Sequence, residues 1–259
     1  MKNFYHFFTT LLLLTCIVAG CSHQEQDTQA ENSIELTVSA AASLQDALEE
    51  LQTTYEKEHN AIKILYNFGG SGALQQQILQ GAPADLFFSA AEDKFDALVD
   101  KDIAAGTDLL ANELVLVVPK NSDKQIQSFD DITKAGKIAL GTPETVPAGQ
   151  YGMETLKNMN LWEEVEPKVV YTKDVRQVLT YTETENVDAG IVYKTDALVS
   201  DKVEIVATAS ATMHTPIVYP VGIIKGSPHA QQAEEFYQFL QSNEAMAVFQ
   251  KYGFKGASE

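Results

Sequence analysis

Short apolar runs alternate with amphipathic stretches along the chain from residue 34 onward. The runs are rich in β-branched and aromatic residues, which is typical of buried strands. The stretches between them place apolar residues at helical spacing, as Leu44, Leu48 and Leu51 do in the first one. Alternation of this kind predicts an α/β fold with mostly parallel sheets. The expected strands are 34–39, 62–67, 85–90, 114–119, 137–141, 168–171, 189–193, 203–208 and 217–224.

Two of these strands, 114–119 and 217–224, are long and apolar and lie far apart in the sequence. We interpret them as the two places where the chain crosses between a pair of lobes. The first lobe is then expected to contain residues 34–115 and 219–259, and the second lobe residues 116–218.

The N-terminal segment predicts export and a lipid anchor. Lys2 precedes an apolar run that ends in the letters VAGC, which resembles a bacterial lipoprotein signal. We therefore expect residues 1–20 to be a signal peptide, Cys21 to carry the lipid, and residues 21–33, which are polar, to be a flexible linker. An uncleaved membrane helix is the alternative, although the run is short for one. These features place the protein outside the cytoplasm, on the membrane.

Composition excludes several classes of function. Removing the signal peptide leaves 17 basic and 36 acidic residues, a net charge of −19, which argues against binding nucleic acid. Cys16 lies in the signal peptide, so the mature chain has one cysteine and no internal disulfide. The five histidines are not paired at ligand spacing, so we expect no metal-cation site.

The candidate site consists of strand ends that share small side chains, hydroxyl groups and the starts of helices. Ligands of open α/β sheets bind beyond the carboxyl ends of the strands, and helix N-termini bind anions through free N–H groups. Each feature also has a simpler explanation: the serines and Asp174 could be helix N-caps, the glycines could serve turns, and the tyrosine could belong to the core. The residues concerned are Ser43 in AAAS, Ser71 in GGSG, Ala148 in VPAG, Val175 in DVR and Tyr193 in GIVY.

The order of these motifs resembles one known family. The segments AAASL, FGGSGALQQQI, GAPADLFFSA, VPAGQY, DVRQVL, GIVYKTDA and KYGF follow one another between residues 34 and 254. They are similar to the molybdate-binding proteins of ABC importers, which belong to the two-lobed substrate-binding proteins. Some of those relatives have several serines where this chain has GGSG, so Ser71 is the single hydroxyl candidate there.

The resemblance implies a role for each site residue. The hydroxyls of Ser43, Ser71 and Tyr193 and the backbone at Ala148 and Val175 are expected to hold molybdate or tungstate. The expected partners are that oxyanion, a membrane permease and the membrane itself through the lipid; we expect a monomer without a cofactor. Because every expected group is a neutral donor, the site should prefer an anion without a proton, and hydrogenphosphate should bind poorly.

Arg176, the only arginine in the chain, follows Val175 directly. It could contact the oxyanion, or it could brace Asp174 or a neighbouring carboxylate, and we favour the brace.

Two other functions have to be weighed. The first is a binding protein of the same fold for sulfate or a small organic anion. The second is a serine hydrolase, because GGSGA around Ser71 comes close to G-x-S-x-G and His214 or His229 follows later in the chain. The motif lacks its final glycine, so we expect no enzyme.

Overall fold

The computed structural model describes residues 33–258. The predicted signal peptide, Cys21 and the predicted linker up to residue 32 lie outside the described residues. Within them the strands form two separate sheets, one of six strands and one of five. The strands are β1 (Ile34–Ala41), β2 (Ile62–Gly69), β3 (Leu86–Phe88), β4 (Ile103–Ala111), β5 (Leu114–Pro119), β6 (Ile138–Gly141), β7 (Val169–Thr172), β8 (Ala189–Tyr193), β9 (Val203–Thr208), β10 (Val218–Ile224) and β11 (Lys255–Gly256).

Helices connect most of these strands. The α-helices are α2 (Gln45–Glu58), α3 (Ser71–Leu79), α4 (Glu92–Val99), α5 (Pro147–Asn158), α6 (Trp162–Val165), α7 (Val175–Glu183), α8 (Lys194–Leu198), α9 (Ala230–Leu240) and α10 (Asn243–Lys251). Residues 33–258 also contain the short 3-10 helices η1 (Ala42–Leu44), η2 (Asp130–Lys134) and η3 (Glu166–Lys168).

The first sheet has the strand order β11-β4-β10-β3-β1-β2. Strand β1 pairs in parallel with β2 and β3, while β10 pairs antiparallel with β3 and β4. The sequence pattern did not predict β4 or β11. In β4 the letters IAAGTDLLA include Gly106 and several alanines, which have low β-propensity, and half of the strand is exposed.

The second sheet has the order β7-β6-β8-β5-β9. Strand β6 pairs in parallel with β7 and β8, and β5 pairs antiparallel with β8 and β9. The predicted α/β fold with two lobes is therefore confirmed, and its sheets are mixed rather than mostly parallel. Parallel pairing is confined to strands joined through helices, because a parallel neighbour needs a crossover connection.

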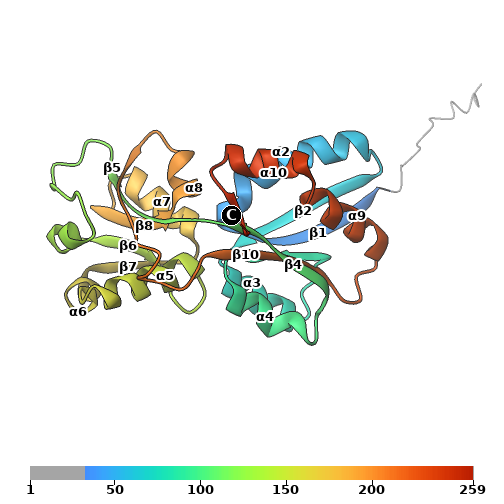
Figure 1. The fold of residues 1–259 in the computed structure, drawn as a ribbon, viewed down its shortest axis with the longest axis horizontal. Coiled ribbons are helices and arrows are strands. Elements are labelled where there is room, and N and C mark those ends of the chain that lie inside the picture. The colour runs from blue at the N-terminus through green and yellow to red at the C-terminus, as the bar shows by residue number, and fades with distance from the viewer. Residues whose placement is uncertain (1–32, 259) are drawn as a thin grey trace, which may run out of the picture. The chain divides into compact units, whose positions relative to one another are not determined.

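Helices cover both faces of each sheet (Figure 1). Helices α2, α9 and α10 lie on one side of the first sheet, with α3 and α4 on the other. Helices α7 and α8 lie on one side of the second sheet, and α5 and α6 on the other. Apolar side chains of both lobes form one continuous buried core, and a smaller cluster lies between α3, α4 and the first sheet. The strand ends that should carry the site are therefore held by well-buried elements.

The chain passes between the sheets twice, from β4 to β5 and from β9 to β10. The strands place Leu114 and Val115 with the second sheet and Val218 with the first. The lobe limits expected from the sequence, 34–115 plus 219–259 and 116–218, remain a prediction. No helix in residues 33–258 is long and apolar enough to cross a membrane.

Candidate anion-binding site

All five candidate residues line one small cavity to which both lobes contribute. The space open to the centre of a water-sized sphere is about 10 Å³, room for one water molecule. None of the residues around it is charged. They are Ala41, Ala42, Ser43, Gly69, Gly70, Ser71 and Ala90 from the first lobe, and Val146, Pro147, Ala148, Val175 and Tyr193 from the second.

Ser43 is placed by the end of β1. The strand stops at Ala41 and the chain turns through the 3-10 helix η1 before α2 begins, so Ser43 lies one residue before Leu44, the N-cap of α2. Its side chain is buried, and its Oγ lies 2.9 Å from the hydroxyl of Tyr219. Ala41 and Ala42, which precede it, line the same cavity with their small side chains.

Ser71 is the first residue of α3, and Gly70 occupies the N-cap position with extended backbone. Ser71 is fully buried, and its Oγ accepts the backbone N–H of Ala90 at 2.9 Å. The oxygen is thus engaged as an acceptor, and the hydroxyl hydrogen remains for another partner. The N-cap explanation therefore does not hold for Ser71.

Two glycines of the second motif permit close contact with the other lobe. The N–H of Gly72 donates to the carbonyl of Thr145 at 3.0 Å. A Cβ on Gly70 would lie 2.6 Å from that same carbonyl oxygen, and one on Gly72 would lie 2.9 Å from the Cα of Thr145. The φ of Gly70 is −68°, which any residue adopts, so the requirement here is space rather than a turn conformation.

The second lobe presents two helix N-termini and one strand end. Pro147 begins α5, as its fixed φ predicts, and Ala148 follows it. Val175 begins α7, where Asp174 is the N-cap and accepts the N–H of Gln177 at 2.8 Å. The N–H groups of Ala148 and Val175 lie in first turns, where no intrahelical acceptor is available.

Tyr193 ends β8 and is 1% exposed. Its hydroxyl donates to the carbonyl of Ala90 in the first lobe over 3.5 Å, which is a weak bond. Burial raises the pKa of Tyr193 well above its ordinary value, so the hydroxyl keeps its hydrogen at neutral pH. Tyr151 makes a similarly long bond to the same carbonyl.

Arg176 does not line the cavity. Its guanidinium pairs with Asp46 of α2 in the first lobe and, at 2.7 Å, with Asp196 of α8 in the second. Burial raises the pKa of Asp196 to about 6, and the charge of Arg176 acts in the opposite direction. Arg176 thus braces two carboxylates across the lobes, neither of which is Asp174.

Three further residues belong to the surroundings of the site and were not singled out in the sequence. They are Ala90, whose backbone contacts Ser71 and Tyr193, Tyr219, which contacts Ser43, and Asn112, which contacts Tyr219. Asn112 lies in the first crossing between the lobes, and Tyr219 lies on β10, directly after the return crossing. No sequence motif singles them out, because their contacts with the site residues arise only when the folded chain brings distant segments together.

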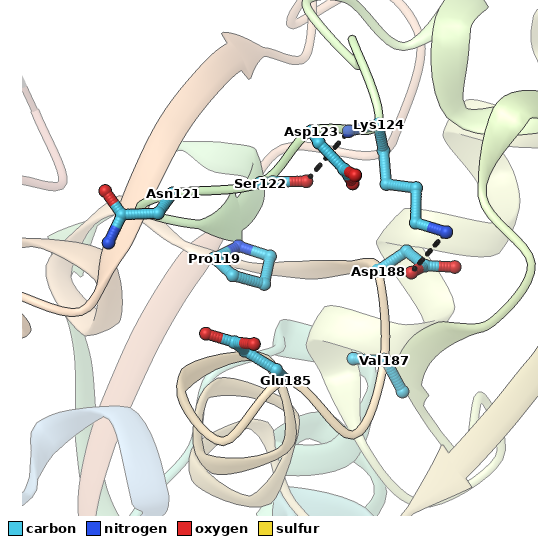
Figure 2. A pocket seen from close by; sticks show the side chains of 8 residues that line it. All are labelled: Pro119, Asn121, Ser122, Asp123, Lys124, Glu185, Val187 and Asp188. Atoms are coloured by element: carbon cyan, nitrogen blue, oxygen red, sulfur yellow. Dashed lines mark hydrogen bonds and ion pairs between the residues drawn. The ribbon is translucent and has the colours of Figure 1, made fainter.

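Two larger hollows differ in chemistry from this cavity. One of about 360 Å³ is lined by Asp123, Glu185 and Asp188 among others (Figure 2). There Asp188 lies 3.5 Å from Lys124 and accepts two backbone N–H groups. The other, of about 380 Å³, is lined by Glu35, Asp85 and Asp102 among others. Carboxylates at both hollows disfavour an anionic ligand.

The hydrolase alternative finds no support in the geometry. No histidine is among the residues described around the cavity, and Ser71 bonds a backbone N–H rather than a base. The ring of His214 contacts the carbonyl of Thr215, and His229 lines the hollow of about 380 Å³. Among residues 33–258, no group of three or more acidic, histidine or cysteine side chains is placed to hold a metal ion.

A buried, uncharged cavity between two α/β lobes, lined by hydroxyls and helix N-termini, is typical of the ligand site of a binding protein. Comparison with known proteins agrees with this class. The model of the family described as bacterial extracellular solute-binding protein matches residues 36–255. The chain belongs to this family, which is not a class of enzymes and whose members act outside the cytoplasm.

Individual relatives cover nearly the same region. The "Putative ABC transporter substrate-binding lipoprotein YvgL" of Bacillus subtilis is 60% identical over 96% of this chain and 97% of its own. The "Molybdate-binding protein ModA" of Haemophilus influenzae is 38% identical over 86% of this chain and 90% of its own. The structure of a periplasmic molybdate-binding protein of Azotobacter vinelandii superposes with a TM-score of 0.75 over 85% of this chain and 98% of its own, at 24% identity.

Proposed function

We propose that this protein binds the tetrahedral oxyanion molybdate, and also tungstate, and delivers it to the permease of an ABC transporter. The observation that carries the proposal is the gathering of Ser43, Ser71, Ala148, Val175 and Tyr193 around one uncharged cavity. The relatives named for molybdate binding, at 38% identity, support the choice of ligand.

The donors suit a dianion without a proton. Three hydroxyls and two first-turn N–H groups offer hydrogens, and each bond to a charged acceptor contributes about 1.5 to 3 kcal/mol. After losses on binding, five such bonds are consistent with micromolar or tighter affinity. Hydrogenphosphate needs an acceptor for its own hydrogen, which these groups do not supply. The net charge of −19 opposes binding only weakly, because distant surface charges are screened by salt.

An anion with four oxygens is larger than one water molecule, so binding has to widen the cavity. The contacts that can give way most easily are the two 3.5 Å bonds that Tyr151 and Tyr193 make to Ala90. Exchanging the weak bond of Tyr193 for a charge-assisted bond to the anion favours the complex. Because each lobe holds only some of the donors, the ligand stabilises the state in which the lobes are in contact.

The remaining parts of the proposal concern the limits of the lobes, the attachment to the membrane and the oligomeric state. The two lobes comprise residues 34–115 with 219–259 and residues 116–218. A lipid on Cys21 holds the protein at the outer side of the membrane, and the protein acts as a monomer without a cofactor. These statements rest on the sequence motifs and on the family.

Calorimetric titration of the purified protein with molybdate, tungstate, sulfate and phosphate tests the proposed ligand. We expect molybdate and tungstate to bind with similar affinity, sulfate more weakly because it is smaller, and phosphate most weakly because the hydrogen of hydrogenphosphate meets no acceptor. Tight binding of sulfate or of a small organic anion, with none of molybdate, would assign the site to a different ligand.

A further inference from the structure

A line of hydrogen-bonded polar groups leads from the half-buried Asn112 in the first crossing segment to the buried Ser43. Asn112, between β4 and β5, donates from Nδ2 to the hydroxyl of Tyr219 at 3.1 Å. The hydroxyl of Tyr219 in turn lies 2.9 Å from the Oγ of Ser43. Tyr219 is fully buried and lies on β10, the strand that follows the return crossing. Ser43 is therefore connected to the segment that joins the lobes.

The direction of each hydrogen bond follows from the amide of Asn112. Its Oδ1 accepts the backbone N–H of Glu113 at 2.9 Å, which fixes the Nδ2 end toward Tyr219 and Thr195. An amide nitrogen only donates, so the oxygen of Tyr219 accepts from Asn112. The hydrogen of Tyr219 then has Ser43 as its partner at 2.9 Å.

The opposite direction between Tyr219 and Ser43 is unfavourable. If Ser43 donated to Tyr219, the tyrosine oxygen would accept twice and its own hydrogen would lose the partner at 2.9 Å in a fully buried position. A buried donor without a partner is costly. Burial also raises the pKa of Tyr219 well above its ordinary value, so its hydrogen is retained.

We propose that Asn112 and Tyr219 are positioning residues that commit the Ser43 hydroxyl to donating into the cavity, and thereby exclude anions that carry a proton. This rests on the proposed function. With the Ser43 oxygen accepting from Tyr219, its own hydrogen is turned toward the ligand. Ser71 is committed in the same way by the N–H of Ala90. Both serines thus meet the hydrogen of hydrogenphosphate with a hydrogen of their own.

Asn112→Asp tests the direction of the chain with little change of shape. At about pH 8 the new carboxylate only accepts, so Tyr219 donates to it and Ser43 donates to Tyr219. Ser43 then presents lone pairs to the anion instead of a hydrogen. We expect molybdate affinity to fall about ten- to a hundredfold, because one charge-assisted hydrogen bond to the anion is lost.

A double variant separates this effect from the added negative charge. In Asn112→Asp/Tyr219→Phe the charge remains, but Ser43 has no tyrosine hydroxyl to which it can donate. Its hydrogen returns to the cavity, so the double variant should bind molybdate more tightly than Asn112→Asp alone. Equal or weaker binding by the double variant would mean that the charge alone acts, and would overturn the proposal.

Tyr219→Phe alone tests selectivity. It leaves the Ser43 hydroxyl free to rotate, so Ser43 can still donate to molybdate but can also accept the hydrogen of hydrogenphosphate. We therefore expect molybdate affinity to fall less than tenfold, and the ratio of molybdate to phosphate affinity to fall by a larger factor than the molybdate affinity. An unchanged ratio would contradict the proposed role. The matched control is Tyr55→Phe, which removes another buried hydroxyl, one without a partner among the described residues, in a ring packed against Phe236 and Phe239.

Tyr55→Phe should change neither affinity nor selectivity, and thermal melting without ligand shows whether each variant is folded. The proposed function is tested separately by the unaltered protein. If that protein fails to bind molybdate, the ligand proposal is wrong whatever the variants do. If it binds molybdate and the variants fail as described, only the role of Asn112 and Tyr219 is wrong.

Discussion

Neutral side chains can hold a dianion when something else decides which way their hydrogens point. In this protein the oxygen of Ser71 is engaged by the N–H of Ala90, and burial keeps the hydroxyl of Tyr193 protonated. An anion in this cavity would therefore meet neutral hydrogen-bond donors rather than a positive charge. Arg176, the only arginine, is used for two carboxylates outside the cavity.

At the scale of single residues, Tyr193→Phe is the most informative change at the cavity. It keeps the packed ring and removes one hydrogen-bond donor, so molybdate affinity should fall about ten- to a hundredfold. Titration calorimetry measures the change, and thermal melting of the free protein should show little difference, because the bond lost there is 3.5 Å long. Unchanged affinity would remove Tyr193 from the site.

The grouping of the five candidate residues around one cavity could be predicted from the sequence, since each belongs to a short motif at a strand end. Their neighbours could not be predicted in this way. Tyr219 and Asn112 act through hydrogen bonds between segments more than a hundred residues apart, as do Asp46 and Arg176. Local spacing carries no information about which polar side chains meet after folding.

At the scale of elements, the start of α3 determines how closely the lobes approach. The N–H of Gly72 donates to Thr145, and a Cβ at this position would lie within 3.1 Å of three backbone atoms of the other lobe. Strand β4 was not predictable from its sequence pattern, because its exposed alanines and glycine are not typical of a strand. Pairing with β10 stabilises it. Both features depend on long-range contacts.

Gly72→Ala should therefore hinder contact between the lobes. Because backbone atoms cannot yield as a side chain can, we expect molybdate affinity to fall at least tenfold with little loss of stability in the first lobe. Gly69→Ala is the matched comparison, since its Cβ would meet only the side chain of Leu74, at 3.4 Å, and should cost less. Equal effects of the two changes in titration would argue against this role of Gly72.

Arg176→Lys tests the contact between α7, α2 and α8. Lysine keeps the charge but cannot pair with Asp46 and Asp196 at once through a planar group. We expect a lower melting temperature and a smaller loss of affinity than Tyr193→Phe causes. If the loss of affinity is at least as large as that of Tyr193→Phe, Arg176 contacts the anion.

At the scale of the whole molecule, two α/β lobes joined by two crossing segments were predictable from the order of apolar runs. The mixed pairing within each sheet was not, because apolar patterning shows that a strand is buried but not its direction. A ligand held by donors from both lobes links binding to their contact. In the proposed function, that link allows a permease to distinguish the loaded protein from the free one.

The proposed lipid anchor can be tested independently of the ligand. Cys21→Ser should release the protein from the membrane fraction or leave the precursor uncleaved. Fractionation followed by mass spectrometry of the N-terminus measures both outcomes, and ligand affinity serves as the control because it should not change. A mature protein that begins at another residue and carries no lipid would exclude the anchor.

The most direct measurement is a crystal structure of the molybdate complex, with the metal located by its anomalous scattering. We expect one anion in the cavity, with the hydroxyls of Ser43, Ser71 and Tyr193 and the N–H groups of Ala148 and Val175 about 2.7 to 3.0 Å from its oxygens. Arg176 should remain paired with Asp46 and Asp196. An anion bound elsewhere, or one held directly by Arg176, would contradict a site made of neutral donors.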